Sequence, residues 1–286
     1  METTQDDTSF IRNQIPILES NLDAMRQEGD RAKLDSLLTW ISPTEFSAQQ
    51  SDIMTHRQED TGQWFLDAPE FLKWLSEPKQ TLFCPGIPGA GKTMMAAITI
   101  NHLLSAMQNS TNGVAYVYCN YKLRGTERQS VTGVLSAILQ QLVQARPSAR
   151  GATEQLQEKY AKQQNKPPAM DIVNALQATA EQFSVIYLVV DALDEYSEWE
   201  YSRRELLTQL RALQKQIDLR VLVTSRFLPG IVEEFREDPR VEIRANPEDI
   251  KRFIAGQIHR LPNCIQRDAM LQQSIQDTLV EAVDGM

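Results

Sequence analysis

The chain has 286 residues, which is enough for one large domain or two small ones. Hydrophobic residues make up 42% and charged residues 23%, as in an ordinary globular protein. The formal net charge is -9, and because an acidic surface repels phosphodiester backbones, we expect no nucleic-acid partner. The polar, acidic N-terminus does not resemble a secretory signal, and the apolar runs are too short to span a bilayer, so no membrane association is expected.

Three cysteines are present, namely Cys84, Cys119 and Cys264. They lie far apart and form no CxxC pair, which argues against both a zinc site and a disulfide framework. This cysteine usage fits a reducing compartment, and we expect a cytoplasmic protein.

Residues 1–60 are predicted to be a helical N-terminal segment. Residues 61–78, TGQWFLDAPEFLKWLSEP, are denser in aromatic side chains. Here Asp67 and Glu70 have the spacing of a capping box, which predicts a short helix. We expect the aromatic side chains of Trp64, Phe71 and Trp74 to pack against the domain that follows, because aromatic clusters at helical spacing are usually core.

From residue 79 onward, short apolar runs alternate with amphipathic stretches. Candidate strands are 81–84, 114–119, 185–190, 220–224 and 241–244. Candidate helices are 92–107, 129–145, 153–163, 170–182, 202–216 and 229–236. Continuous apolar strands such as VIYLVV are typical of a parallel sheet covered on both faces, so the alternation predicts an open, doubly wound α/β fold.

The most specific pattern in the chain is the loop at residues 86–93, which matches G-x-x-x-x-G-K-[ST]. Its members are Gly86, Ile87, Pro88, Gly89, Ala90, Gly91, Lys92 and Thr93. The loop follows a predicted strand and opens a predicted helix, which is the context that a phosphate-binding loop requires.

Each residue type in this loop has a chemical reason. Glycines let the backbone curl around phosphate oxygens, and their N–H groups and the helix N-terminus attract the anion. Lys92 is expected to reach the β- and γ-phosphates, and the Thr93 hydroxyl to bind Mg²⁺. The alternative is a glycine-rich turn with a solvated lysine. The loop predicts binding of a nucleoside triphosphate, ATP or GTP, with magnesium.

Acidic residues follow the apolar run at 185–190. Asp191 ends that predicted strand and is the candidate for holding Mg²⁺, directly or through water. Asp194 and Glu195 lie just beyond it, where a carboxylate could orient and deprotonate an attacking water. The alternative is a loop of solvated acids. Arg226, after the run at 220–224, is the candidate for sensing charge at the γ-phosphate, or else a surface arginine in an ordinary ion pair.

The order of these motifs, GIPGAGKT, VIYLVVDALDEY and VLVTSRF, resembles the NACHT family of signal-transduction ATPases. It looks closest to the fungal type and to the N-terminal nucleotide-binding module of nephrocystin-3-like proteins, which carry a similar tryptophan-rich lead-in. The resemblance implies a five-stranded parallel sheet in which the Arg226 strand separates the Asp191 strand from the loop strand. It also implies slow hydrolysis of ATP or GTP in an oligomerising switch.

Under this resemblance, residues 86–93 are the Walker A loop, Asp191 with Asp194 and Glu195 is the Walker B strand end, and Arg226 is the first sensor. Residues 61–246 form the P-loop NTPase domain, and 247–286 begin a helical subdomain. Family members continue into further helical and winged-helix domains, so the sequence is interpreted as truncated. We expect the predicted helices at 247–259 and 267–283 to expose apolar side chains suited to protein partners or self-association.

Two other functions compete with a signalling ATPase module. One is a truncated nucleotide-binding adaptor without appreciable hydrolysis. The other is a small-molecule phosphotransferase, which should carry an arginine-rich lid. The sequence has no compact arginine cluster beyond RGTER at 124–128, which disfavours this third reading.

Overall fold

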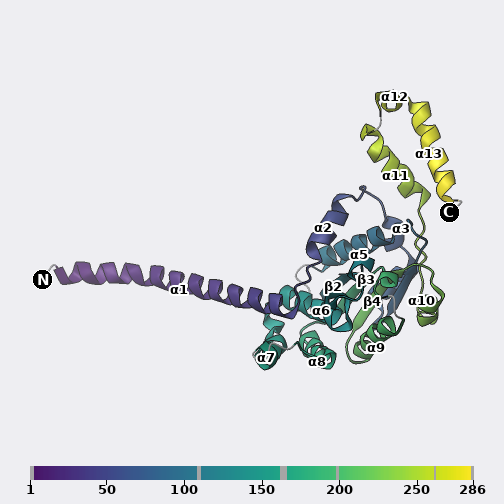
Figure 1. The fold of residues 1–286 in the computed structure, drawn as a ribbon. Helices are drawn as coiled ribbons and strands as arrows, with labels where there is room; N and C mark the ends of the chain where they lie inside the picture. Colours follow the sequence, from purple (N-terminus) through teal and green to yellow (C-terminus); the bar gives the residue numbers. More distant parts are fainter. Residues whose placement is uncertain (1–2, 108–110, 162–165, 198–199, 261, 285–286) are drawn as a thin grey trace.

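A four-stranded parallel sheet lies at the centre of the computed structural model, which describes residues 3–107, 111–161, 166–197, 200–260 and 262–284 (Figure 1). The strands are β1 (Thr81–Pro85), β2 (Gly113–Tyr118), β3 (Ile186–Asp191) and β4 (Leu219–Ser225). Their order across the sheet is β1-β4-β3-β2, so the strand that leads to Arg226 separates the Asp191 strand from the loop strand, as the resemblance implied. Every residue of the four strands is buried, which explains why their sequences are continuous apolar runs.

The expected fifth strand at 241–244 does not form a ladder. The chain does run beside β1, where the Phe83 N–H donates to the Pro239 carbonyl at 2.9 Å and the Ile243 N–H donates to the Pro85 carbonyl at 2.7 Å. The only bridge assigned in this described stretch pairs Phe83 with Arg240. Pro239 has no N–H to extend the pairing, and the chain soon leaves the sheet to begin a helix at Pro247. The fold is therefore α/β with a sheet of four strands rather than five.

Helices cover both faces of the sheet (Figure 1). The helices on one face are α2 (Ser47–Thr55), α3 (Gln63–Leu66), α4 (Pro69–Ser76) and α5 (Lys92–Ala106). Those on the other are α6 (Val131–Ala145), α8 (Ala169–Ala180) and α9 (Glu200–Gln216), with α7 (Gly151–Tyr160) packed on α8. The helix α10 (Pro229–Glu234) follows β4, and short 3-10 turns are η1 (Tyr121–Leu123), η2 (Glu127–Gln129), η3 (Pro147–Ala149), η5 (Leu193–Glu195) and η6 (Ile258–Arg260).

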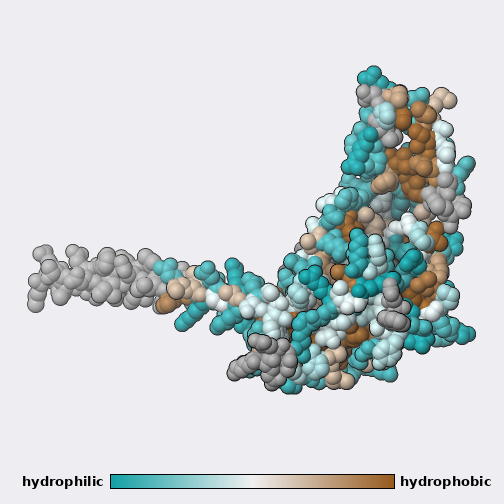
Figure 2. Space-filling model, in the orientation of Figure 1, coloured by the Kyte–Doolittle hydropathy of each residue, from teal (hydrophilic) through white to brown (hydrophobic). Residues whose placement is uncertain are grey.

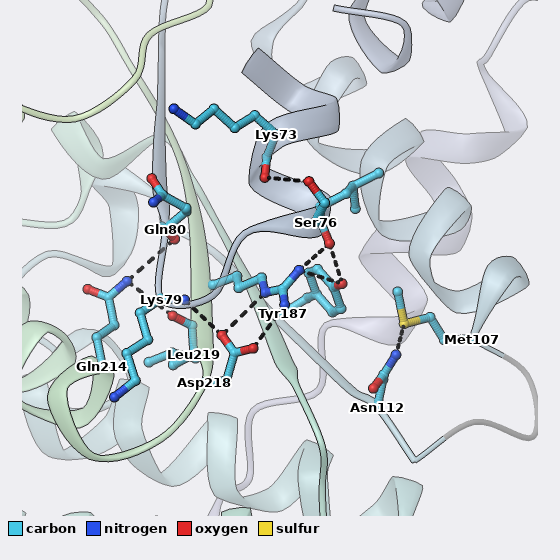
Figure 3. Close-up of polar contacts among 12 residues, drawn as sticks. Lys73, Ser76, Lys79, Gln80, Met107, Asn112, Tyr187, Gln214, Asp218 and Leu219 are labelled. Carbon is cyan, nitrogen blue, oxygen red and sulfur yellow. Dashed lines mark hydrogen bonds and ion pairs between the residues drawn. The ribbon is translucent and has the colours of Figure 1, made fainter. Parts of the chain in front are cut away.

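The segment before β1 is anchored to the amino-terminal edge of the sheet (Figure 3). The Trp74 ring is 1% exposed and packs edge-on against Tyr187, with 5.4 Å between ring centroids. The Tyr187 hydroxyl donates to the Leu75 carbonyl at 3.0 Å, and Arg220 donates to the same carbonyl while it pairs with Asp218 at 2.9 Å. The expected burial of Trp74 is confirmed, and the segment is part of the core.

The capping box predicted at Asp67 is wrong. Helix α4 begins at Pro69 after an Ala68 cap that makes no side-chain hydrogen bond. Asp67 instead ends α3, where its carboxylate accepts a hydrogen bond from the Gln63 amide at 2.9 Å. Proline is well suited to the first helical position because its missing N–H would find no partner there, and this places Asp67 one residue too early to cap.

Two helical arms extend from the sheet and its covering helices (Figure 1). At one end is α1 (Thr3–Ile41), whose last turns bury Leu37, Leu38 and Ile41 whereas Met25 is 70% exposed. At the other are α11 (Pro247–Gln257), α12 (Asn263–Gln266) and α13 (Ala269–Asp284).

The carboxyl-terminal arm exposes apolar side chains, as Figure 2 shows on one side of α13. Ile254 is buried, whereas Phe253, Met270 and Leu271 are exposed. Across the described ranges, none of the helices has the length and apolarity needed to cross a bilayer. The three-part division of the chain at residues 60 and 246 stays a prediction.

Candidate nucleotide site

The glycine-rich loop joins β1 to α5 and has the backbone of an anion-binding nest. Gly89 and Gly91 have φ values of 82° and 88°, in the left-handed region that glycine adopts at little cost. Within the described ranges, no acceptor is found for the N–H groups of Gly89, Gly91, Lys92 and Thr93. These donors lie at the N-terminus of α5, where the helix dipole is positive, so the loop can bind an anion such as phosphate.

Gly86, the first glycine of the motif, is required for a different reason. A Cβ at this position would lie 2.4 Å from the Ile243 carbonyl oxygen. The Gly86 N–H also donates to the Ser225 carbonyl at the end of β4, at 3.0 Å. From the sequence, the absence of a side chain at Gly86 was expected to let phosphate approach the backbone. In the structure, it lets the chain segment beside β1 approach instead.

The Lys92 side chain folds back over the loop. Its ammonium donates to the carbonyls of Gly86 at 2.9 Å and Ile87 at 2.8 Å. Burial lowers the pKa of Lys92, and the charges of Asp194 and Asp191 act in the opposite direction. The ammonium therefore lies in the field of the strand-end carboxylates, in the loop that also carries the unpaired N–H donors.

Asp191 ends β3 and joins three elements of the fold. It is 3% exposed, and its two carboxylate oxygens accept hydrogen bonds from Thr93 at 2.9 Å and from Thr224 at 2.6 Å. Burial raises the pKa of Asp191, and the two hydroxyl hydrogen bonds lower it. A carboxylate beside a threonine hydroxyl is an oxygen donor set that suits Mg²⁺, which usually takes one or two protein ligands and keeps several waters.

The backbone beyond Asp191 is strained and held in place by Thr224. Ala192 has a φ of 53°, which is uncommon for a residue with a side chain. Its N–H donates to the Thr224 hydroxyl at 2.9 Å, so one hydroxyl fixes both the carboxylate and the turn after it. Thr224 was not predicted as a site residue from the sequence, although its place near the end of an apolar strand beside the Asp191 strand was an available signal.

Asp194 and Arg226, which were assigned separate roles from the sequence, bind each other. Asp194 is 4% exposed and accepts hydrogen bonds from the Arg226 side-chain Nε at 2.5 Å and backbone N–H at 3.0 Å. Both carboxylate oxygens of Asp194 are thus engaged by Arg226, one by its side chain and one by its backbone. In this structure Asp194 therefore anchors Arg226.

Glu195 lies at the same edge of the sheet, in a loop that is hydrogen-bonded to the segment following β2. Its carboxylate accepts a hydrogen bond from the Tyr121 N–H at 3.2 Å. Arg124 donates to the carbonyls of Asp194 at 3.0 Å and Glu195 at 3.2 Å, and Gln129 donates to the Glu195 carbonyl at 2.8 Å. The first arginine of RGTER, Arg124, thus supports the acidic loop. Neither Arg124 nor Gln129 was predicted in this role from the sequence.

A cavity of about 880 Å³ opens beside the loop. It is lined by Trp64, Ile87, Pro88, Gly89, Ala90, Glu242, Arg244, Ala245, Asn246, Pro247 and Ile250. Its size falls within the range of about 300–1,000 Å³ that is usual for small-molecule sites. Trp64 is half-buried and forms part of the wall, so the expectation that it packs in the core like Trp74 is only partly right.

This loop, its following helix and the acidic end of β3, one strand beyond the neighbouring β4, give the chain a fold like that of P-loop NTPases. The sequence matches the family model described as the N-terminal region of nephrocystin 3 over residues 60–226, which is more than half of the chain. The chain belongs to this nephrocystin 3 N-terminal family.

Solved structures with similar folds include a Walker-type ATPase of Pyrococcus abyssi, with 12% identity over 78% of this chain and 64% of that one, at a TM-score of 0.48. The structure of Drosophila ORC bound to DNA matches with 17% identity over 83% of this chain and 57% of that chain, at a TM-score of 0.46. The replication initiator DnaA, bound to AMPPCP and single-stranded DNA, matches with 15% identity over 73% of this chain and 53% of that chain, at a TM-score of 0.36. The chain spans between half and two thirds of the length of these solved chains. A search of curated proteins finds no match.

The prediction that nucleic acid is excluded as a partner is wrong as stated. Two of the three solved structures named above are of proteins bound to DNA. The prediction rested on a net charge of -9, which is summed over the whole chain. Such a sum does not describe the local surface that would meet a nucleic acid, so it cannot exclude one.

Proposed function

We propose that this chain is the nucleotide-binding module of a NACHT-like signalling switch, which binds ATP with Mg²⁺ and hydrolyses it slowly. The observation that carries the proposal is the hydrogen-bonded chain from Thr93 through Asp191 to Thr224. It brings a loop hydroxyl and a buried strand-end carboxylate together beside an anion-binding nest. That combination supports recognition of a metal-bound phosphate.

The phosphates would lie in the loop, against the N–H groups of Gly89, Gly91, Lys92 and Thr93. These donors are fixed before the ligand arrives, so little reorganisation is needed. Lys92 would exchange its contacts with the carbonyls of Gly86 and Ile87 for phosphate oxygens. Because its ammonium is partly desolvated, a charge-assisted contact there is stronger than it would be on the surface.

Thr93 and Asp191 would hold Mg²⁺. When bound, the ion neutralises charge on the β- and γ-phosphates. Asp191 must be ionised to serve as a ligand, and because burial raises its pKa, a nearby cation favours that form. Before the ion binds, the hydrogen bonds from Thr93 and Thr224 orient the Asp191 carboxylate.

For hydrolysis, Glu195 is the better candidate for orienting and deprotonating a water. Asp194 would act through Arg226, holding the guanidinium near the position where γ-phosphate charge develops. The Arg226 side chain is 45% exposed, so part of it can contact a ligand while Asp194 retains the rest.

The competing function is a nucleotide-binding adaptor without appreciable hydrolysis. The ion pair between Asp194 and Arg226 favours it, because one of the two acidic candidates is then occupied and the other accepts a backbone hydrogen bond from Tyr121. The cavity lining contains no side-chain pattern that separates adenine from guanine, so GTP competes with ATP as the ligand.

The test is a titration of ATP, ADP and GTP with Mg²⁺ against the purified chain, followed by an assay of phosphate release. Saturable binding that requires Mg²⁺, with slow release of phosphate, supports the switch module. Binding without release supports the adaptor. Absence of binding to all three nucleotides contradicts both.

A further inference from the structure

The outer wall of the nucleotide cavity is built from two segments that are distant in sequence. The Asp249 carboxylate, on α11, accepts hydrogen bonds from the Gly62 N–H at 2.8 Å and from the Trp64 indole N–H at 3.1 Å. The first pair is separated by 187 residues. The Asp249 side chain is only 17% exposed, so these bonds are largely shielded from water.

The geometry of both partners is fixed by their surroundings. Gly62 has a φ of 82°, and a Cβ there would lie 2.5 Å from the Ile98 side chain, so the position requires glycine. On the other side, Asn246 caps α11 by accepting hydrogen bonds from the N–H groups of Glu248 at 2.9 Å and Asp249 at 3.2 Å. The first turn of α11 therefore presents Asp249 to the lead-in in a defined orientation.

A second contact extends the docking along α11. The Arg252 guanidinium donates to the Asp60 carbonyl at 2.6 Å. Gly256, one turn further, lies so close to the Gln58 side chain that an added Cβ would clash with it. Gln58, Asp60 and Gly62 thus contact α11 along its length, from Asp249 in its first turn to Gly256 in its last.

The two segments also bound the same cavity. Trp64 comes from the lead-in, and Ile250 follows Asp249 on α11. Both face the space beside Ile87–Ala90 of the phosphate loop. The hydrogen bond between Asp249 and Trp64 therefore links the aromatic wall of the cavity to the helix that closes its other side.

We infer that Asp249 is a positioning residue that fixes Trp64 in the cavity wall and makes α11 a lid whose docking controls nucleotide release. This inference rests on the proposed function. Breaking the contacts of Asp249 frees the Trp64 ring and unseats α11, and the cavity then opens without disturbing the phosphate loop or the sheet. The position of the carboxyl-terminal arm therefore determines how long the nucleotide stays bound.

The direct test compares Asp249→Ala with Glu248→Ala. Glu248 is on the same turn but is exposed and pairs with Lys251, so it is a matched control. Release of a fluorescent ADP analogue, followed by stopped flow on the full chain, should be about 10-fold faster in Asp249→Ala, as expected for loss of hydrogen bonds to a charged acceptor. It should be unchanged in Glu248→Ala. Equal release rates in Asp249→Ala and wild type would overturn the inference.

A second variant separates positioning from general loss of structure. Trp64→Phe keeps an aromatic wall but removes the N–H donor. If Asp249 acts partly through Trp64, the acceleration caused by Asp249→Ala should be smaller in the Trp64→Phe background than in wild type. The same acceleration in both backgrounds would show that Asp249 does not act through Trp64 and would contradict the positioning role.

Hydrogen exchange without nucleotide distinguishes failure of this inference from failure of the proposed function. Asp249→Ala should lose protection at Gly62 and along α11, whereas Glu248→Ala should retain it. Unchanged protection in Asp249→Ala would overturn the docking. If wild type binds no nucleotide, the proposed function fails and the control of release fails with it, while the exchange result still decides whether Asp249 seats α11.

Discussion

The two sides of the proposed nucleotide site are built in different ways. On the inner side, Ile87 to Ala90 of the phosphate loop line the cavity. The ends of β3 and β4 support this inner wall from outside the cavity lining, and there Asp191 and Thr224 are buried and bonded to each other. The outer wall consists of Trp64 and Ile250, which are only half-buried and are joined through Asp249. Disturbing the inner wall disturbs the core, whereas the outer wall can open by breaking a few hydrogen bonds. We therefore propose that the site combines a rigid phosphate-binding side with a movable cover.

The largest effect should separate two tryptophans of the lead-in. Trp74→Ala should lower the free energy of unfolding by about 3–5 kcal/mol, because it removes a fully buried aromatic side chain from the core. Trp64→Ala should cost only about 1 kcal/mol, because that ring is half-buried in a cavity wall. Urea denaturation of both variants measures the difference, and equal losses would contradict the distinction between the two walls.

Hydrolysis should depend on the two acidic residues in different ways. Glu195→Gln should leave nucleotide binding nearly intact and slow phosphate release by about 100-fold or more, as expected for loss of a general base. Asp194→Asn should weaken the hold on Arg226 and thus reduce the preference for ATP over ADP. Phosphate-release and binding assays on both variants check this. A wild-type rate of hydrolysis in Glu195→Gln would contradict the assignment of the base.

The inner wall also depends on a close backbone contact. Gly86→Ala should destabilise the fold by about 1–3 kcal/mol, because its Cβ would overlap the Ile243 carbonyl, which cannot move without displacing the segment beside β1. Gly151→Ala is the control, because a Cβ there meets no atom within 4 Å, and its effect should stay within about 0.5 kcal/mol. Equal thermal stability of the two variants would show that the contact is loose.

Local pattern was sufficient to predict the elements that form the inner wall, but not Thr224 or the contacts between strand ends. Strands, helices and the loop at 86–93 follow from hydrophobic periodicity and glycine placement, and Asp191 follows from its place at a strand end. The pairing of Asp194 with Arg226 was missed because it joins residues from two strand ends, and neither residue's neighbours in sequence reveal it. Trp64 was read as core for a similar reason, since the helix that turns it into a cavity wall begins at Pro247.

The smallest effect concerns the pH dependence of stability. Burial raises the pKa of Asp191 above its value in the unfolded chain, so the folded state binds its proton more tightly. Its contribution to stability is therefore present at low pH and is lost as pH rises from the ordinary carboxyl range through the raised pKa. Without Mg²⁺, Asp191→Asn should gain stability relative to wild type as pH rises through that window. Urea denaturation of both proteins across a pH series measures this, and a constant difference would contradict it.

The most direct test of the nucleotide site is calorimetric titration of Mg²⁺ and ATP into wild type and Lys92→Ala. Lys73→Ala is the control, because Lys73 lies on α4, outside the phosphate loop, where its exposed side chain pairs with Glu77. Removing the Lys92 ammonium should cost about 2–5 kcal/mol of binding free energy, as for loss of one partner of a partly desolvated charge pair. We expect ATP to bind to wild type and to Lys73→Ala, and to bind Lys92→Ala with an affinity at least about 30-fold lower. Equal ATP affinity in all three proteins would contradict it.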